Sequence, residues 1–137
     1  MKITRSTTIV AFLASCFLAA VAAAESDTVL RSRLVGTWEE LRIVDNERHE
    51  HRIALRNDGE FEVNGVLREG KKSTPFVWRG KWQVKNGKFV YTTTFSKPPE
   101  IYPLGESFSD TIVSVTETEW IMIEQSTGEK SRARRIK

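Results

Sequence analysis

Along most of the chain after residue 36, apolar and polar residues alternate with a period of two. This alternation is typical of β-strands that bury one face and expose the other to water. It is clearest in the stretch 75–84, where Phe76, Trp78 and Trp82 fall on one face. The next stretch repeats the pattern, and the residues expected on its inner face are Phe89, Tyr91, Thr93 and Phe95.

Eight strands are predicted in this way, each bounded by turn residues such as Gly, Asn, Asp and Pro. A short helix is predicted before them over 26–35, because Leu30 and Leu34 are one helical turn apart and Ser26 or Asp27 can cap it. The predicted strands lie at about 37–44, 49–56, 60–67, 75–84, 88–95, 110–116, 119–125 and 130–136.

The links between these strands alternate in length. The short links are 57–59, 85–87 and 117–118. The long links are 45–48, 68–74 and 96–109. Successive turns of an up-and-down array fall at opposite ends, and closure into a barrel hides both edge strands. We therefore expect an all-β fold: an eight-stranded antiparallel up-and-down barrel, with the helix at the end of the short turns and the long loops around an open mouth.

The first 24 residues have the pattern of a cleavable signal peptide. A basic start precedes an apolar stretch over 8–21, and three alanines then precede polar sequence. The sequence thus predicts a signal peptide at 1–24 and a barrel domain at 25–137, which is periplasmic or secreted. An alternative is that Cys16, which follows Leu-Ala-Ser, is lipidated as in bacterial lipoproteins, and membrane attachment is expected only in that case.

Composition narrows the range of partners. Cys16 is the only cysteine, so the domain after residue 24 has no disulfide and must be held by packing. Lys2 and Arg5 are two of the 21 basic residues, which leaves 19 against 18 acidic residues and a net charge of +1. A balance this close to neutral does not favour a nucleic acid partner.

Several short motifs occur in an order that resembles the lipocalin-like (calycin) families, and within them the short bacterial lipocalin-like domains. The motifs are Gly36 with Trp38, Asp58-Gly59, Gly80 with Trp82, and Gly128 followed by Arg134 or Arg135. The resemblance covers residues 29–136. It implies structural roles for Gly36 and Trp38, with the tryptophan at the closed end of the barrel beneath Arg134 or Arg135.

Aromatic residues are the candidates for binding a ligand inside the barrel. Those expected on inner strand faces could line a cavity for a small apolar or amphipathic molecule, or could simply form the core: Trp78, Tyr91, Phe95, Trp120 and Met122. Tyr102 and Phe108 lie in the long link 96–109, which could cover such a cavity or pack against an edge.

Other chemistry has weaker support in the sequence. Glu47, His49 and His51 share one face of a strand and could bind a metal ion. The carboxylates of Glu39, Glu40, Glu60 and Glu62 are expected on solvated faces. No phosphate-binding loop or nucleophile elbow occurs, so we expect neither an enzyme nor a cofactor. The hypotheses are non-catalytic ligand binding, then a protein interaction module of the cell envelope, then a metal-binding barrel.

Overall fold

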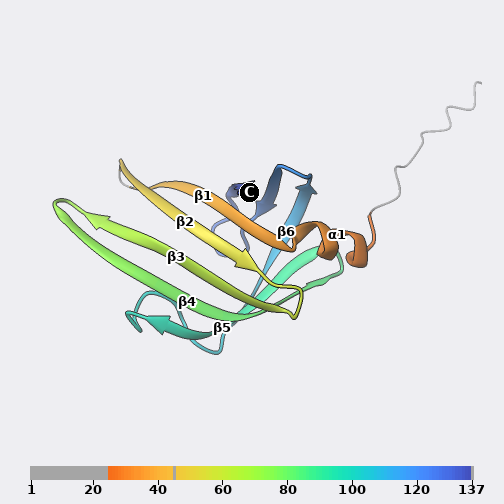
Figure 1. Ribbon diagram of the computed structural model, residues 1–137, viewed down its shortest axis with the longest axis horizontal. Helices are drawn as coiled ribbons and strands as arrows, with labels where there is room; N and C mark the ends of the chain where they lie inside the picture. Colours follow the sequence, from red (N-terminus) through yellow and green to blue (C-terminus); the bar gives the residue numbers. More distant parts are fainter. Residues whose placement is uncertain (1–24, 45, 137) are drawn as a thin grey trace, which may run out of the picture.

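A computed structural model describes residues 25–44 and 46–136 of the chain. In this part of the chain one helix, α1 (Asp27–Leu34), precedes eight antiparallel strands that form a closed barrel in sequence order (Figure 1). The strands are β1 (Gly36–Val44), β2 (Glu47–Leu55), β3 (Glu60–Glu69), β4 (Lys72–Lys85), β5 (Lys88–Lys97), β6 (Ser107–Val115), β7 (Glu119–Ile123) and β8 (Lys130–Arg135). The predicted fold class is confirmed. The predicted signal peptide and Cys16 lie outside the described residues.

The predicted helix is confirmed as α1. The Ser26 hydroxyl caps it by accepting a hydrogen bond from the Val29 N–H at 3.3 Å. Leu30 and Leu34 are buried against the barrel, as their spacing predicted. In the described part of the chain, no helix is both long enough and apolar enough to cross a membrane.

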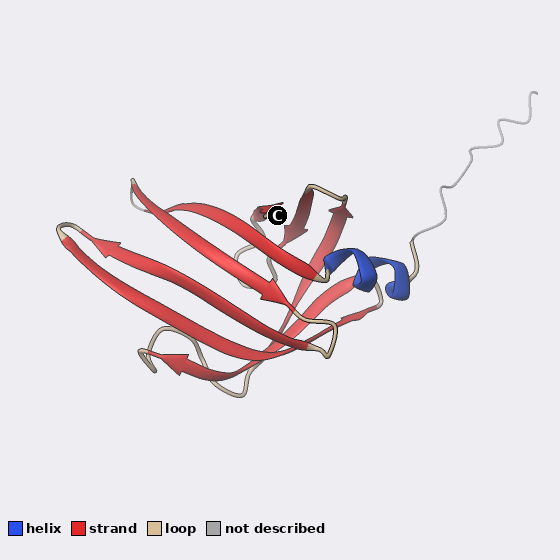
Figure 2. Cartoon of the chain, viewed as in Figure 1, coloured by secondary structure: helices blue, strands red, loops and turns tan. Residues whose placement is uncertain are grey.

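Hydrogen bonds fix α1 at the end of the barrel that carries the β2–β3 and β4–β5 turns (Figure 2). The Asp27 carboxylate accepts the N–H groups of Asn86 and Gly87 in the β4–β5 turn, each at 2.8 Å. The Arg31 guanidinium donates to the Asn57 side chain in the β2–β3 turn at 3.1 Å. Two neighbouring hairpins are thus tied to one helix, and the helix covers this end of the barrel.

The opposite end differs from the prediction in its turns. β1 and β2 pair as far as Val44 and Glu47, and β3 and β4 pair as far as Glu69 and Lys72. The strands therefore continue into the links expected at 45–48 and 68–74, and the β3–β4 link is a turn of two residues. Asn46 and Gly70 adopt positive φ angles of 64° and 61°, which suit tight turns. The β3–β4 hairpin extends furthest at this end (Figure 1), and in the described part of the chain only 98–106 and 124–129 remain as longer loops there.

A β-bulge corrects the prediction for Phe95. The β4–β5 register shifts where Arg79 pairs with Phe95 and Gly80 pairs with Thr93, so Thr94 is an extra residue. An extra residue reverses the alternation of side chains beyond it. Phe95 therefore lies on the outer surface, 41% exposed, with the Arg79 guanidinium 5.1 Å from its ring. The prediction that Phe95 lines the interior was wrong.

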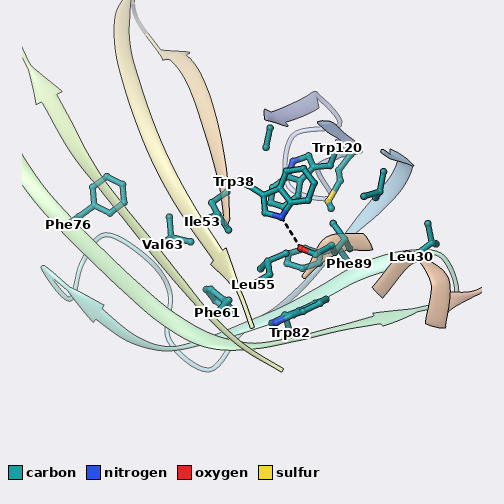
Figure 3. Close-up of a cluster of buried hydrophobic side chains, with 14 residues drawn as sticks. Leu30, Trp38, Ile53, Leu55, Phe61, Val63, Phe76, Trp82, Phe89 and Trp120 are labelled. Atoms are coloured by element: carbon teal, nitrogen blue, oxygen red, sulfur yellow. Dashed lines mark hydrogen bonds between the residues drawn. The ribbon is translucent and has the colours of Figure 1, made fainter. Parts of the chain in front are cut away.

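Trp38 is the centre of the closed end. It is fully buried, its ring centroid lies 4.9 Å from that of Trp120, and its Nε1 donates to the Leu34 carbonyl at 2.8 Å (Figure 3). The guanidinium carbon of Arg135 lies 4.1 Å from the Trp38 ring. Arg134 faces outward and donates to Glu39 at 2.7 Å. Of the two arginines that the sequence left open, Arg135 is the one that covers Trp38.

Arg135 also joins the helix to the sheet. Its guanidinium donates to the carbonyls of Glu117 at 2.7 Å and Val35 at 3.0 Å, and it contacts the carbonyl of Arg33. Gly36 has a φ of 142°, and a Cβ there would lie 2.4 Å from Arg135 Nη1. Glycine at position 36 therefore leaves room for the arginine.

Candidate functional site

A cavity of about 240 Å³ lies inside the barrel, between the core at the helix end and the open mouth. Apolar side chains line its deeper part: Ile53, Leu55, Phe61, Val63, Phe89, Trp120 and Met122. The barrel is therefore not filled by its own side chains at this level. An apolar cavity of about 150 Å³ is already large enough to bind benzene, so this one has room for a ring with a short polar chain.

Most of the residues singled out in the sequence as candidates for lining a cavity meet here. Trp78, Tyr91, Tyr102, Trp120 and Met122 line it. Phe108 stands behind this wall, because its ring packs on those of Tyr91 and Tyr102 at centroid distances of 5.6 and 5.7 Å. Phe95, on the outer surface, takes no part in it.

The loop 98–106 covers one side of the cavity. Its Tyr102 ring stacks on Trp78 with 4.8 Å between centroids, and its hydroxyl shares a hydrogen bond of 2.8 Å with that of Tyr91. The Gly105 N–H donates to the Thr93 carbonyl at 2.9 Å. The loop thus matches both interpretations, because Tyr102 lines the cavity and Gly105 bonds to the part of β5 that β6 does not pair.

A cluster of charged side chains forms the polar wall. Arg42 Nε donates to Glu40 Oε1 at 2.9 Å, and the same guanidinium contacts Glu124. Thr127 donates to the other Glu124 oxygen at 3.1 Å. Glu40 and Glu124 are buried, at 6% and 9% exposure. Burial raises the pKa of the Glu40 carboxyl, although the Arg42 charge acts to lower it.

Asp110 is a third buried carboxyl on the cavity wall. Its Oδ1 accepts a hydrogen bond from the Gln125 N–H at 3.1 Å. Burial raises its pKa, and the charge of Glu124 acts in the same direction. Since Arg42 already contacts two other carboxylates, Asp110 is the least compensated acid in this wall.

His51 lies beside the cluster and carries no charge near neutral pH. Its ring meets Phe76 and Trp78 edge-on, with centroids 5.2 and 5.8 Å away, and its Nδ1 is 3.9 Å from Glu40 Oε2. Burial lowers the pKa of His51 to about 4, and the charge of Arg42 acts in the same direction. The imidazole can therefore exchange hydrogen bonds with a ligand but adds no positive charge to the wall.

The metal-site hypothesis gains no support from the described side chains. Among them, no group of three His, Cys, Asp or Glu residues is placed to hold a metal ion. His49 is buried and His51 lines the cavity. The side chain of Glu47 lies outside the described part of the structure, so the grouping of Glu47, His49 and His51 stays a prediction.

The low pKa of His51 predicts how stability depends on pH. The folded state disfavours the imidazolium, so the stabilisation from neutral His51 is complete above the ordinary pKa of 6.5 and is lost as pH falls through about 4. Between about pH 7 and pH 4, wild-type protein should lose about 3 kcal/mol more unfolding free energy than His51→Gln, as the shift of the pKa requires. Urea unfolding of both proteins at each pH measures the difference.

Glu40 and Asp110 act in the opposite sense in both proteins. Because their pKa values are raised, these two carboxyls stabilise the folded state as pH falls. Wild type and His51→Gln both contain them, so their contributions cancel when the two pH profiles are compared. Parallel pH profiles for wild type and His51→Gln would contradict the assignment of an uncharged, buried His51.

The acidic wall was not predicted from the sequence, although a signal for it was present. Trp38 points inward, and a period of two places Glu40 and Arg42 on the same face of β1. The expectation that Glu40 is solvated was therefore wrong. In β6, Asp110 likewise lies two residues before Ile112, and Glu124 lies two residues after the buried Met122.

Comparison with known proteins adds no further identification. The chain matches no protein-family model, and a search of curated proteins found no match. Fold and cavity therefore define the class: a closed, eight-stranded, antiparallel up-and-down barrel with an internal cavity that has an apolar floor and an acidic wall.

Proposed function

We propose that this protein is an exported, lipocalin-like, non-catalytic binding protein that holds a small amphipathic molecule inside its barrel. The observation that carries the proposal is the cavity of about 240 Å³, which joins an apolar floor to a polar wall. Ligand sites in proteins typically combine a mostly apolar lining with a few polar groups that orient the ligand.

The order of groups along the cavity supports an amphipathic ligand rather than a purely apolar one. Trp120 and Met122 lie at the buried floor, whereas Glu40 and Arg42 lie on the polar wall. An apolar body is stabilised on the floor by removal from water, and a polar group finds partners on the wall. Arg42 bonds with its neighbouring carboxylates, which supports a role in holding and orienting rather than in reacting.

A small quenching ligand tests the proposal. We expect 4-nitrobenzyl alcohol, a ring with one hydroxyl, to quench tryptophan fluorescence saturably, because Trp78 and Trp120 line the cavity. At about 100 times its dissociation constant it should stabilise the fold by about 2.7 kcal/mol, seen as a rise in melting temperature.

Matched variants localise the effect. Ile53→Phe fills part of the cavity and should abolish saturable quenching and thermal stabilisation. Val113→Phe adds a ring at a position that is 50% exposed and should leave both unchanged. If wild type shows no saturable quenching, or if Ile53→Phe binds as wild type does, the cavity is not the binding site and the proposal fails.

A further inference from the structure

We infer that the ligand of this cavity is a small arylalkyl amine, whose ammonium group sits against Asp110 and the neighbouring carboxylates while its ring occupies the apolar floor. This inference rests on the proposed binding function and names the chemical class of the ligand. Three independent features carry it: the balance of charge, the aromatic walls and the size of the cavity.

The cavity wall contains more acid than base. Three carboxyl groups line it, from Glu40, Asp110 and Glu124, whereas Arg42 is the one cationic side chain among the described lining residues. His51 is uncharged near neutral pH because burial holds its pKa at about 4. The remaining titratable groups, Tyr91 and Tyr102, have pKa values raised by burial and stay neutral. Burial raises the pKa of the Glu40 and Asp110 carboxyls, and a cation beside them would favour their charged forms. The wall therefore favours a cation over an anion.

The hydrogen bonds within the wall leave this excess uncompensated. Arg42 contacts both Glu40 and Glu124, so one guanidinium serves two carboxylates. Asp110 accepts its hydrogen bond from a backbone N–H and has no cationic side chain bonded to it in the described structure. A buried carboxylate is costly unless a charge or several donors accompany it. An ammonium group supplies both, because it carries a positive charge and three donors.

The aromatic lining suits the rest of such a molecule. Trp78, Tyr91 and Tyr102 form one continuous group at the mouth, since Tyr102 stacks on Trp78 and its hydroxyl bonds to that of Tyr91. Faces of such rings attract cations by about 0.5–2 kcal/mol and stack on aromatic ligands. An amine passing this group meets favourable contacts before it reaches Asp110.

The volume limits the size of the amine. A cavity of roughly 150 Å³ accommodates benzene. This cavity, at about 240 Å³, has further space for a short chain and a charged head. 2-Phenylethylamine has these proportions and serves as the probe. Two comparison compounds carry the same ring on a similar chain. 2-Phenylethanol has a neutral head group, and 3-phenylpropionate has an anionic one.

Isothermal titration of the three compounds at about pH 7 tests the inference. We expect the amine to bind at least about 10-fold more tightly than the alcohol, which corresponds to about 1.4 kcal/mol, and the carboxylate to bind most weakly. Asp110→Asn retains an oxygen for the Gln125 N–H and removes the charge. It should lower amine affinity about 10-fold and alcohol affinity much less, so that the preference for the amine falls. Glu39→Gln, on the outer face one residue before Glu40, is the matched control and should bind all three as wild type does.

The outcomes separate this inference from the proposed function. If the alcohol or the carboxylate binds as tightly as the amine, the preference for a cation is wrong and ligand binding in the cavity stands. If Asp110→Asn keeps the full preference for the amine, the assigned position of the ammonium is wrong. If none of the three compounds binds and 4-nitrobenzyl alcohol does not quench, the inference and the proposed function fail together.

Discussion

Replacing Trp38 with alanine is expected to lower the free energy of unfolding by about 3–5 kcal/mol, the range for truncating a large buried aromatic residue. Trp38 is fully buried, packs against Trp120, and bonds through Nε1 to the Leu34 carbonyl of the helix. Its loss leaves a void at the closed end, where the helix, β1 and β7 meet. Chemical unfolding of wild type and Trp38→Ala by urea measures the difference.

A double-mutant cycle separates the stacking of Arg135 on Trp38 from the rest of this effect. Trp38→Ala and Arg135→Ala should be coupled by about 0.5–2 kcal/mol, because the guanidinium lies 4.1 Å from the ring. Arg134→Ala is the control, since Arg134 faces Glu39 on the outer surface and should add independently to Trp38→Ala. Additive effects for both arginines would remove the stacking interaction from the account.

Gly80→Ala is expected to be as damaging, by about 3 kcal/mol or more, because it places a carbon atom inside the backbone of the next strand. A Cβ at position 80 would lie 1.9 Å from the Thr92 carbonyl oxygen and 2.8 Å from a ring carbon of Phe61. The β4–β5 bulge begins at this point, so the strands must separate or the bulge must move. We expect thermal unfolding of Gly80→Ala to show a lower melting temperature and a broader transition than that of wild type.

Gly105→Ala controls for the general cost of replacing a glycine. Gly105 has a φ of 79° and no atom within 4 Å of its added Cβ, so the substitution costs only the backbone strain of about 1–2 kcal/mol. If Gly80→Ala is no more destabilising than Gly105→Ala, the claim that β4 and β5 leave no room for a side chain at position 80 is contradicted.

The eight strands and their order could be predicted because alternation and turn residues are local properties of the chain. Trp78 and Trp82 share a face between the charged residues Arg79 and Lys81, and turn residues separate most of the strands, so up-and-down pairing follows from short connections. The helix was predictable for the same reason, since a capping serine precedes a leucine pair with helical spacing.

The orientation of Phe95 and the lengths of the mouth hairpins could not be predicted in the same way. A bulge depends on contacts between two strands, and the close approach of Gly80 to Thr92 appears only when β4 and β5 pair. The turns at Asn46 and Gly70 likewise let the strands continue through mostly polar sequence, where the apolar alternation fades.

The acidic wall was missed for a different reason. Glu40, Asp110 and Glu124 each lie two residues from an inward-facing apolar side chain, so the alternation itself places them inside. Glu40 was expected in solvent because it is charged, although its position in the alternation places it inside. A charged residue on the apolar face of an otherwise regular strand is rarely buried without a partner, and it is therefore a signal for a functional site.

The central claim, that a ligand enters the barrel and reaches its floor, is tested most directly by the methyl resonance of Met122. Met122 is 2% exposed and lines the cavity, and Met1 is the only other methionine in the chain, so methyl-labelled methionine places a nearly unique probe at the floor. Titration with 2-phenylethylamine should shift the Met122 methyl signal saturably, with the dissociation constant found by calorimetry. A Met122 signal that stays in place while the amine binds elsewhere would contradict the account.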